Sequence, residues 1–367
     1  MNVTKSILIF ASIIFLLQHT HAQQTTIQQV RKLQSSPALY NAHKITEKII
    51  IDGKMDEIWA KAPWSSPFSD IEGDGQPVPP LKTQFKMLWD DNNLYIYAKL
   101  EEPHIWASIQ QRDAIIYHDN DFEVFLKPNP SSPLYYELEI NPHNTVMDLL
   151  MPKPYRFGGQ ALMHWDIQKL QTALHVEGTL NNPDDKDSYW SVEIAIPFQS
   201  LTKFGTRKTP SLNSHWRMNF SRVQWQHQLE NGQYSRKKEN QKFLPEDNWV
   251  WSPIGLINMH YPERWGYIYF TADSTIDSYP ASYCAERTAW NIHYLQQIHR
   301  NKEQQYAAEL SSLEGYAEFL KEDLKYFDVQ ITVAADKSFY RVSLKEKNST
   351  HFFTIDNHGN YTTNYEQ

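Results

Sequence analysis

The sequence has almost no cysteine and a single run of hydrophobic residues long enough to suggest a targeting segment. One cysteine, Cys284, excludes an internal disulfide, so burial of apolar side chains must stabilise the fold. The apolar run, residues 7–17, follows Lys5, precedes Thr20-His21-Ala22 and is too short to span a bilayer. This pattern is typical of a signal peptide over residues 1–22, and it predicts an exported protein, periplasmic or extracellular, without a transmembrane segment in the mature chain.

An excess of basic residues is also lacking. The chain has 35 Lys and Arg against 43 Asp and Glu, a formal net charge of -8. Binding to nucleic acid requires clustered Lys and Arg that displace counterions, so this charge excludes a nucleic-acid partner. The sequence has no His-Glu-x-x-His, Gly-x-Ser-x-Gly or glycine-rich phosphate loop, and these motifs are what zinc enzymes, serine hydrolases and nucleotide binders need.

Hydrophobic and aromatic residues are abundant, at 41% and 14% of the chain, and they indicate a folded protein with a large core. Apolar and polar residues alternate with a period of two in many short segments, separated by loops rich in Pro, Asn and Asp. The predicted strands are residues 83–89, 94–100, 122–126, 134–141, 145–150, 174–180, 190–196, 216–223 and 266–270. Because helices do not alternate with these strands, the sequence predicts an all-β fold, an antiparallel β-sandwich of two packed sheets.

The composition changes along the chain and predicts four regions. After the signal peptide, residues 23–45 are rich in Gln, Ser and Thr and are predicted to be a linker, and residues 46–271 form the sandwich. Helical spacing over residues 285–308 and 310–324 precedes three alternating segments. Residues 285–360 are therefore predicted to form a small α+β C-terminal extension.

Two of the predicted strands carry carboxylates and amides on one face. Glu123 points away from Phe122 and Val124, and Glu137, Glu139 and Asn141 point away from the apolar residues of the next strand. We expect these side chains to form a polar row on a solvated sheet face. Such a row suits sugars, because hydroxyl groups need planar polar partners while the C–H faces of the ring stack on aromatic side chains.

Five segments, in this order along the chain, resemble carbohydrate-binding module family 9, in the form found in exported bacterial proteins. They are Ile51-Asp52-Gly53-Lys54-Met55-Asp56-Glu57-Ile58-Trp59, Leu88-Trp89-Asp90-Asp91-Asn92-Asn93-Leu94-Tyr95, Asp119-Asn120-Asp121-Phe122-Glu123-Val124-Phe125, Tyr135-Tyr136-Glu137-Leu138-Glu139-Ile140-Asn141, and residues 190–198 with their Val-Glu-Ile-Ala-Ile-Pro core. The resemblance implies a sandwich that binds sugars without cleaving them, often carries structural calcium and is often attached to polysaccharide-degrading enzymes.

The same resemblance assigns roles to individual positions. It places the family's binding glutamate at Glu123 and its first stacking tryptophan near Tyr117. The second stacking tryptophan falls near Met259-His260, close to Trp265, and the family's binding arginine falls near Glu139, which has the opposite charge. This chain therefore departs from the family in several of its binding side chains.

These observations predict a non-catalytic carbohydrate site. Its predicted ligand-binding residues are Glu123, Tyr117, Arg112, Glu139 and Asn141, with Arg264 and Trp265 at its edge. Asp119 and Asp121 are oxygen donors of the kind that calcium prefers, although capping of a turn by these side chains explains them better. Structural calcium is the only cofactor that the sequence suggests, and an oligo- or polysaccharide is the predicted partner.

Two other functions remain open at this point. Glu137 and Glu139, two residues apart on one strand face, have a spacing compatible with the acid and base of an inverting glycoside hydrolase. Alternatively, the sandwich is the scaffold of an envelope interaction module, and the extension after Ala285 binds a protein partner.

Overall fold

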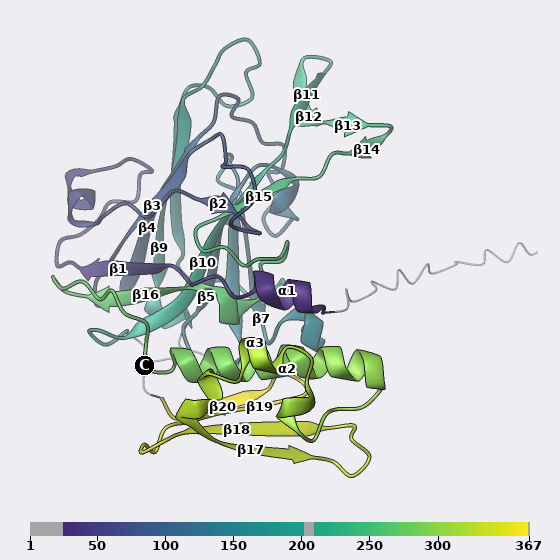
Figure 1. Cartoon of the computed structure of the whole chain (residues 1–367). Coiled ribbons are helices and arrows are strands. Elements are labelled where there is room, and N and C mark those ends of the chain that lie inside the picture. Colours follow the sequence, from purple (N-terminus) through teal and green to yellow (C-terminus); the bar gives the residue numbers. More distant parts are fainter. Residues whose placement is uncertain (1–24, 202–208, 366–367) are drawn as a thin grey trace, which may run out of the picture.

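The computed structural model describes residues 25–201 and 209–365, so the predicted signal peptide, residues 1–22, lies outside the described residues. A large curled sheet dominates the molecule (Figure 1). Its strands follow the order β7, β6, β5, β10, β16, β1, β3, β4, β9, β8. In that order they are Val146–Met151, Tyr135–Ile140, Phe122–Lys127, His215–Gln224, Gly266–Thr271, Leu39–Lys44, Thr83–Trp89, Asn93–Glu101, Tyr189–Pro197 and Gln171–Glu177.

The sheet curls so that its two halves pack face to face around one hydrophobic core. Side chains of β5, β6, β10 and β16 meet those of β3, β4 and β9 in this core. Phe85 of β3 and Phe220 of β10, for example, lie 4.0 Å apart between ring centroids. The prediction of an all-β sandwich is therefore confirmed, with its two layers formed by the halves of one continuous sheet.

The strand that joins the two halves differs from the prediction. β1 lies between β16 and β3 and runs parallel to both, whereas the alternating pattern suggested antiparallel pairing throughout. It falls in residues 23–45, which we expected to be a linker, and helix α1, Ile27–Lys32, precedes it. Only Tyr40 and Ala42 of β1 reach the sandwich core, so its sequence of mixed polar residues gave no visible period.

Buried hydrogen bonds join the first and the last of the five segments that resemble the family. The 3-10 helix η1, Glu57–Lys61, lies over the outer face of β4 and β9, where Trp59 is fully buried. Its indole N–H donates to Glu193 of β9 at 2.8 Å, and the N–H groups of Asp52 and Gly53 donate to the other carboxylate oxygen. Gly53 has φ +83, and a Cβ there would lie 2.3 Å from the carbonyl carbon of Leu174, so only glycine fits this turn.

The connection after β10 is longer and more structured than predicted. It contains two small hairpins, which project from the sandwich in Figure 1, and strand β15, which pairs with β10 and with β2. These strands are β11 His227–Glu230, β12 Gln233–Arg236, β13 Lys238–Glu239, β14 Lys242–Phe243, β15 Asp247–Val250 and β2 Ser69–Asp70. The remaining 3-10 helices in and beside the sandwich are η2 Ile116–His118, η3 Tyr155–Phe157, η4 Phe198–Leu201 and η5 Pro262–Arg264.

The C-terminal region packs against the outer face of the β5–β6–β7 half. Helix α2, Tyr283–Glu303, lies between the large sheet and a four-stranded sheet (Figure 1). The predicted second helical stretch, 310–324, is broken into three short helices, and Gly315, with φ +86, immediately precedes the second of them. The elements after α2 are η6 Leu310–Ser312, α3 Tyr316–Phe319, η7 Asp323–Tyr326, β17 Phe327–Val333, β18 Tyr340–Glu346, β19 Phe352–Asp356 and β20 Tyr361–Thr363.

A continuous core joins this C-terminal region to the sandwich. Phe125 and Met147 of the large sheet share one hydrophobic cluster with Leu295 of α2 and Leu344 of β18. Arg217 of β10, which is 4% exposed, forms an ion pair with Glu286 of α2 at 2.6 Å. Removing one partner of such a buried pair leaves an uncompensated charge, so the two regions stabilise each other.

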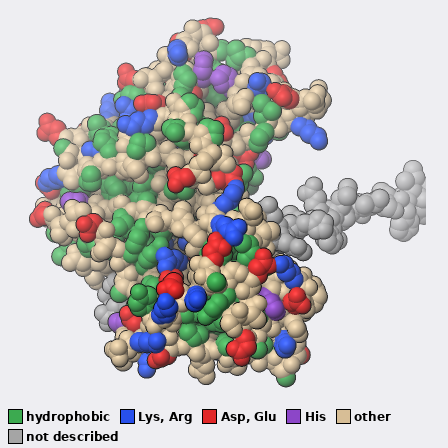
Figure 2. Space-filling view, viewed as in Figure 1, with side chains coloured by type: hydrophobic (Ala, Val, Ile, Leu, Met, Phe, Trp, Pro, Cys, Tyr) green, Lys and Arg blue, Asp and Glu red, His purple; other side chains and the backbone are tan. Residues whose placement is uncertain are grey.

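Among residues 25–201 and 209–365, no helix has the length and hydropathy that crossing a membrane requires. On the face drawn in Figure 2, side chains of both charge signs are interspersed.

The shared core leads to a first prediction. Leu295→Ala, which removes a side chain that is 1% exposed, should lower the free energy of unfolding by about 2–5 kcal/mol. Leu229→Ala is the matched control, because Leu229 is 52% exposed, and its effect should stay within about 0.5 kcal/mol. Urea unfolding followed by tryptophan fluorescence measures both. An equal cost for the two variants would contradict the position of α2 in the core.

Candidate functional site

Four carboxylates gather on the outer face of β5 and β6. Glu123 of β5 lies directly opposite Glu139 of β6 in the antiparallel register, with Glu137 two residues away and Asp121 just before β5. Carboxylate oxygens of Asp121, Glu123 and Glu139 all lie within 4.8 Å of one another. The alternation in the sequence therefore predicted which side chains share this face.

Their burial differs from the prediction of a solvated row. Asp121, Glu123 and Glu139 are 0%, 5% and 2% exposed, and Glu137 is also buried. The cover comes from the loop that contains η2, whose Tyr117 N–H donates to Glu139 Oε2 at 3.0 Å. Strand alternation predicts the direction of a side chain but not the loop that covers it, so the row forms a buried floor instead of an open surface.

This environment raises the pKa of every member of the group. Burial raises the pKa of Glu123 to about 7, and burial together with the charge of Glu123 raises that of Glu137 to about 8. The pKa values of Asp121 and Glu139 also lie well above their usual range, first because of burial and then because of the neighbouring carboxylates. No Lys, Arg or His in the described parts of the chain forms an ion pair with any of the four.

Two buried oxygens of this group lack hydrogen-bond partners among the described residues. They are Asp121 Oδ2 and Glu137 Oε2. The other oxygen of Asp121 accepts the Val223 N–H at 3.2 Å. Buried acceptors are usually paired, so these two atoms are suited to interact with something outside the protein's own hydrogen-bond network.

Two exposed tyrosines form a rim beside the acidic floor. Tyr117 of η2 is 40% exposed and Tyr155 of η3 is 48% exposed. Burial raises the pKa of each phenol, and after it the carboxylates contribute: Glu139 for Tyr117, and Glu137 and then Glu139 for Tyr155. The charges of these carboxylates therefore act on both phenols, although the two rings come from different loops.

The rim side chains are held by contacts to other loops. The indole N–H of Trp225 donates to the carbonyl of Tyr117 at 2.7 Å. The Tyr155 ring meets the His260 ring edge to face at 4.6 Å, and His260 Nδ1 lies 2.7 Å from the Tyr135 hydroxyl. Sequence reasoning missed Tyr155. The available signal was an aromatic residue in the loop that follows β7, the strand next to the acidic row.

Asn141 and Asp119, both predicted for the site, are engaged inside the protein. Asp119 accepts four hydrogen bonds, from the N–H and hydroxyl of Ser108, the N–H of Ile109 and the amide of Asn141. The same Asn141 amide donates to the Ile109 carbonyl at 2.8 Å. These two side chains hold the loop that covers the floor, and neither carboxylate oxygen of Asp119 remains free of partners.

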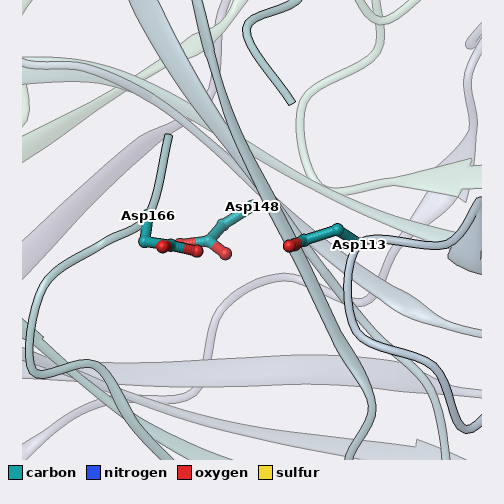
Figure 3. Close-up of side chains that lie close together, drawn as sticks. All are labelled: Asp113, Asp148 and Asp166. Atoms are coloured by element: carbon teal, nitrogen blue, oxygen red, sulfur yellow. The ribbon is translucent and has the colours of Figure 1, made fainter. Parts of the chain in front are cut away.

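Arg112 belongs to a separate acidic group at the edge of β7. Figure 3 shows Asp113, Asp148 and Asp166, whose carboxylate oxygens lie within 4.8 Å of one another. Arg112 forms ion pairs with all three, at 2.9 Å from Asp166 and 3.8 Å from Asp113, and with Asp148. The positive charge of the Arg112 guanidinium offsets the negative charges of the three aspartates. Burial nevertheless raises the pKa of Asp148 to about 6. Arg112 therefore does not point into the floor.

Arg264 and Trp265 also lie away from the rim. Trp265 is fully buried, donates its indole N–H to Met259 and packs on Phe125 and Tyr135 with ring centroids 5.5 and 5.2 Å away. Arg264 is 5% exposed and donates to the carbonyl of Ser35. The C-terminal region covers both, and no pattern in the sequence indicates that this region packs on the sandwich.

The domain that carries this site matches a known family. Residues 51–222 match the family model described as carbohydrate family 9 binding domain-like. Residues 51–222 are thus similar to carbohydrate-binding module family 9 domains, as the five sequence segments predicted. All four floor acids and both rim tyrosines lie within the matched residues, and the C-terminal region lies outside them.

Curated relatives match over the same part of the chain. Exoglucanase XynX of Acetivibrio thermocellus is 26% identical over 185 residues, and endo-1,4-beta-xylanase A of Thermoanaerobacterium saccharolyticum is 27% identical over 184 residues. Each match covers 50% of this chain but only 15% and 14% of the relative. The chain is therefore similar to a small part of each of these enzymes.

Solved structures show a more distant similarity. A family 9 carbohydrate-binding module from Caldicellulosiruptor kristjanssonii, in complex with cellotriose, is 18% identical with a TM-score of 0.42, covering 66% of this chain and 98% of that one. A putative carbohydrate-binding protein from Bacteroides uniformis is 14% identical with a TM-score of 0.47, covering 64% and 100%.

The half-buried histidine beside the rim gives a second prediction. Burial and then the charge of Arg156 lower the pKa of His260 to about 4, below the value of about 6.5 for an unfolded chain. Between these values the unfolded chain binds one more proton, so the folded state loses stability as the pH falls. Relative to His260→Gln, the wild-type protein should lose up to about 3 kcal/mol between pH 7 and pH 4.

Urea unfolding of both proteins at several pH values measures this difference. Because the other titratable groups are common to both chains, their contributions cancel in the comparison. A constant difference across this pH range would contradict a His260 that is neutral in the folded protein.

Proposed function

We propose that this chain is an exported protein whose family 9-like domain binds an oligo- or polysaccharide without cleaving it. The observation that carries the proposal is the arrangement of Tyr117 and Tyr155, two exposed rings from separate loops beside a floor of carboxylates. Aromatic faces stack on the C–H faces of a sugar, while carboxylates accept hydrogen bonds from its hydroxyl groups. A single sugar can therefore contact the tyrosine rings and the carboxylates at the same time.

The proposed site keeps part of the set predicted from sequence. Glu123, Glu139 and Tyr117 remain proposed ligand-binding residues, and Tyr155 joins them in place of an aromatic near Met259-His260. Asn141 supports the site by bracing its loop through Asp119. Arg112, Arg264 and Trp265 are assigned to the fold because each is engaged with other protein groups.

The family match and the named relatives support this proposal and suggest the ligand class. The relatives are an exoglucanase and xylanases, and the chain matches only a small part of each. We therefore propose a β-linked glucan or xylan as the ligand and a role in polysaccharide degradation. Export to the periplasm or cell exterior is proposed from the pattern of residues 1–22 and agrees with a polymeric substrate.

A binding role fits the carboxylates better than hydrolysis does. A glycosidase places its two carboxyl groups on opposite sides of the scissile bond. Here Glu137 and Glu139 belong to one strand and one floor, together with Glu123 on the adjacent strand. All three lie on the same side of any ring held by the tyrosines, so we propose binding without bond cleavage.

Removing the rim provides the third prediction. Tyr155→Ala and Tyr117→Ala should each weaken binding of cello- or xylo-oligosaccharides by about tenfold, the usual loss when a central aromatic contact is truncated. Isothermal titration calorimetry with both oligosaccharide series measures the affinity. The matched control is Tyr326→Ala in the C-terminal region, where the tyrosine is 64% exposed and should not contribute to binding.

The outcomes separate the candidate functions. No binding by the wild-type protein, or equal losses in all three variants, would overturn the proposed site. Release of shorter sugars from the same oligosaccharides, followed by chromatography, would instead favour the hydrolase that the sequence left open.

A further inference from the structure

One arginine on the projecting hairpins lacks the partners that other arginines of the protein have. Arg236 of β12 is half-buried, yet within residues 25–201 and 209–365 it forms no ion pair and donates no side-chain hydrogen bond. The other arginines in these ranges, apart from the exposed Arg341, each donate to a carboxylate or a carbonyl oxygen. They are Arg31, Arg112, Arg156, Arg217, Arg222, Arg264, Arg287 and Arg300. The Arg236 guanidinium therefore has N–H donors available for a ligand.

Two aromatic rings hold the Arg236 guanidinium in place. Its central carbon lies 3.9 Å from the ring centroid of Phe243 and 4.7 Å from that of Trp225. Cation–π contacts of this kind use the faces of the guanidinium and leave its N–H groups, which lie in its plane, free to donate. Phe243 is 46% exposed, and Lys238 Nζ lies 4.9 Å from its centroid. An exposed ring and two cations therefore lie together on the hairpins formed by β11–β14 (Figure 1).

This group adjoins the rim of the carbohydrate site. The indole N–H of Trp225 donates to the carbonyl of Tyr117 at 2.7 Å. Burial raises the pKa of the Tyr117 phenol, and the charge of Arg236 acts against that rise. Burial, and after it the charge of Arg236, lowers the pKa of the neighbouring His118. Glu246 acts on the same two side chains but forms no ion pair with Arg236 in the described parts of the chain. Trp225 thus contacts both the rim and the guanidinium, so neighbouring units of one oligosaccharide can reach the two.

The donors and the ring together fit a sugar that carries a carboxylate. A planar guanidinium binds a carboxylate through two parallel hydrogen bonds. Lys238 adds a second positive charge, and its ion pair with Glu230 is long, at 3.9 Å. The exposed part of the Phe243 ring can stack on the C–H face of a sugar. A uronic acid offers both the ring and the carboxylate, whereas a neutral hexose or pentose lacks the carboxylate.

We propose that Arg236, Lys238 and Phe243 form a subsite for a uronic acid unit of the bound oligo- or polysaccharide. This hairpin subsite rests on the proposed carbohydrate function and narrows the ligand to an acidic glycan, such as a xylan with uronic acid side groups. The floor opposes such a ligand only weakly, because burial raises the pKa values of Glu123 and Glu137 to about 7 and about 8. Near neutral pH these carboxylates carry less negative charge than exposed ones do.

The test compares two ligands of equal backbone length on the whole protein. Isothermal titration calorimetry measures the affinity for a neutral xylo-oligosaccharide and for the same oligosaccharide carrying one glucuronic acid side group. The wild-type protein should bind the acidic ligand at least about tenfold more tightly, because a charged group forms strong hydrogen bonds. This preference should decrease as the salt concentration rises, because salt screens exposed charges.

Variants of the arginine locate the subsite. Arg236→Gln should remove the preference for the acidic ligand, and Arg236→Lys, which keeps the charge but not the planar fork, should retain only part of it. Arg341→Gln is the matched control, because Arg341 is an exposed arginine on β18 of the C-terminal sheet, and this variant should keep the full preference. Circular dichroism of each variant confirms that it is folded.

The outcomes distinguish the subsite from the carbohydrate site as a whole. Equal affinity of the wild-type protein for the two ligands would overturn the subsite, as would a preference that persists in Arg236→Gln or disappears in Arg341→Gln. Neutral binding that depends on Tyr117 and Tyr155, without any preference for the acidic ligand, would support the carbohydrate site and refute only the hairpin subsite. Binding of neither ligand would overturn both proposals.

Discussion

Repulsion among carboxylates that cannot move apart is the constraint on which the candidate site depends. Glu123 and Glu139 face each other across two hydrogen-bonded strands, and their separation is set by the spacing of the sheet. The opposite faces of those strands carry Phe122, Val124 and Leu138, which are fully buried in the sandwich core. Packing on one side and a braced loop on the other hold the acids in place, so the fold stabilises a group that would separate in a flexible chain.

The sequence predicts the strand pattern, but it does not predict the interface between the sandwich and the C-terminal region. Alternation is a local property, and it correctly placed Glu123, Glu137 and Glu139 on one face. Burial of that face depends on η2 and its loop. The positions of Arg264 and Trp265 depend on the packing of α2, which no local pattern in the sequence specifies. Tyr155 was missed for a similar reason, because its role depends on which loop lies beside β6 and β7, and no local pattern specifies that neighbour.

The segments that resemble the family have different physical roles. Trp59, Gly53 and Glu193 form one buried hydrogen-bonded group that covers the outer face of β4 and β9, so their similarity reflects the fold. Tyr117 and Tyr155 are 40% and 48% exposed and lie outside the five segments. Similarity in the first group therefore supports the architecture, while the identity of the ligand depends on the side chains at the rim.

The parallel strand β1 has a consequence for the order in which the molecule is assembled. Leu39 and the residues after it pair with Tyr267 and the residues after it, so the seam between the halves joins segments from opposite ends of the sandwich sequence. During synthesis, β1 leaves the ribosome early and has no partner at β16 until almost three quarters of the polypeptide has been made. Closing this seam requires a long loop to be ordered, and topologies of this kind acquire their native state slowly.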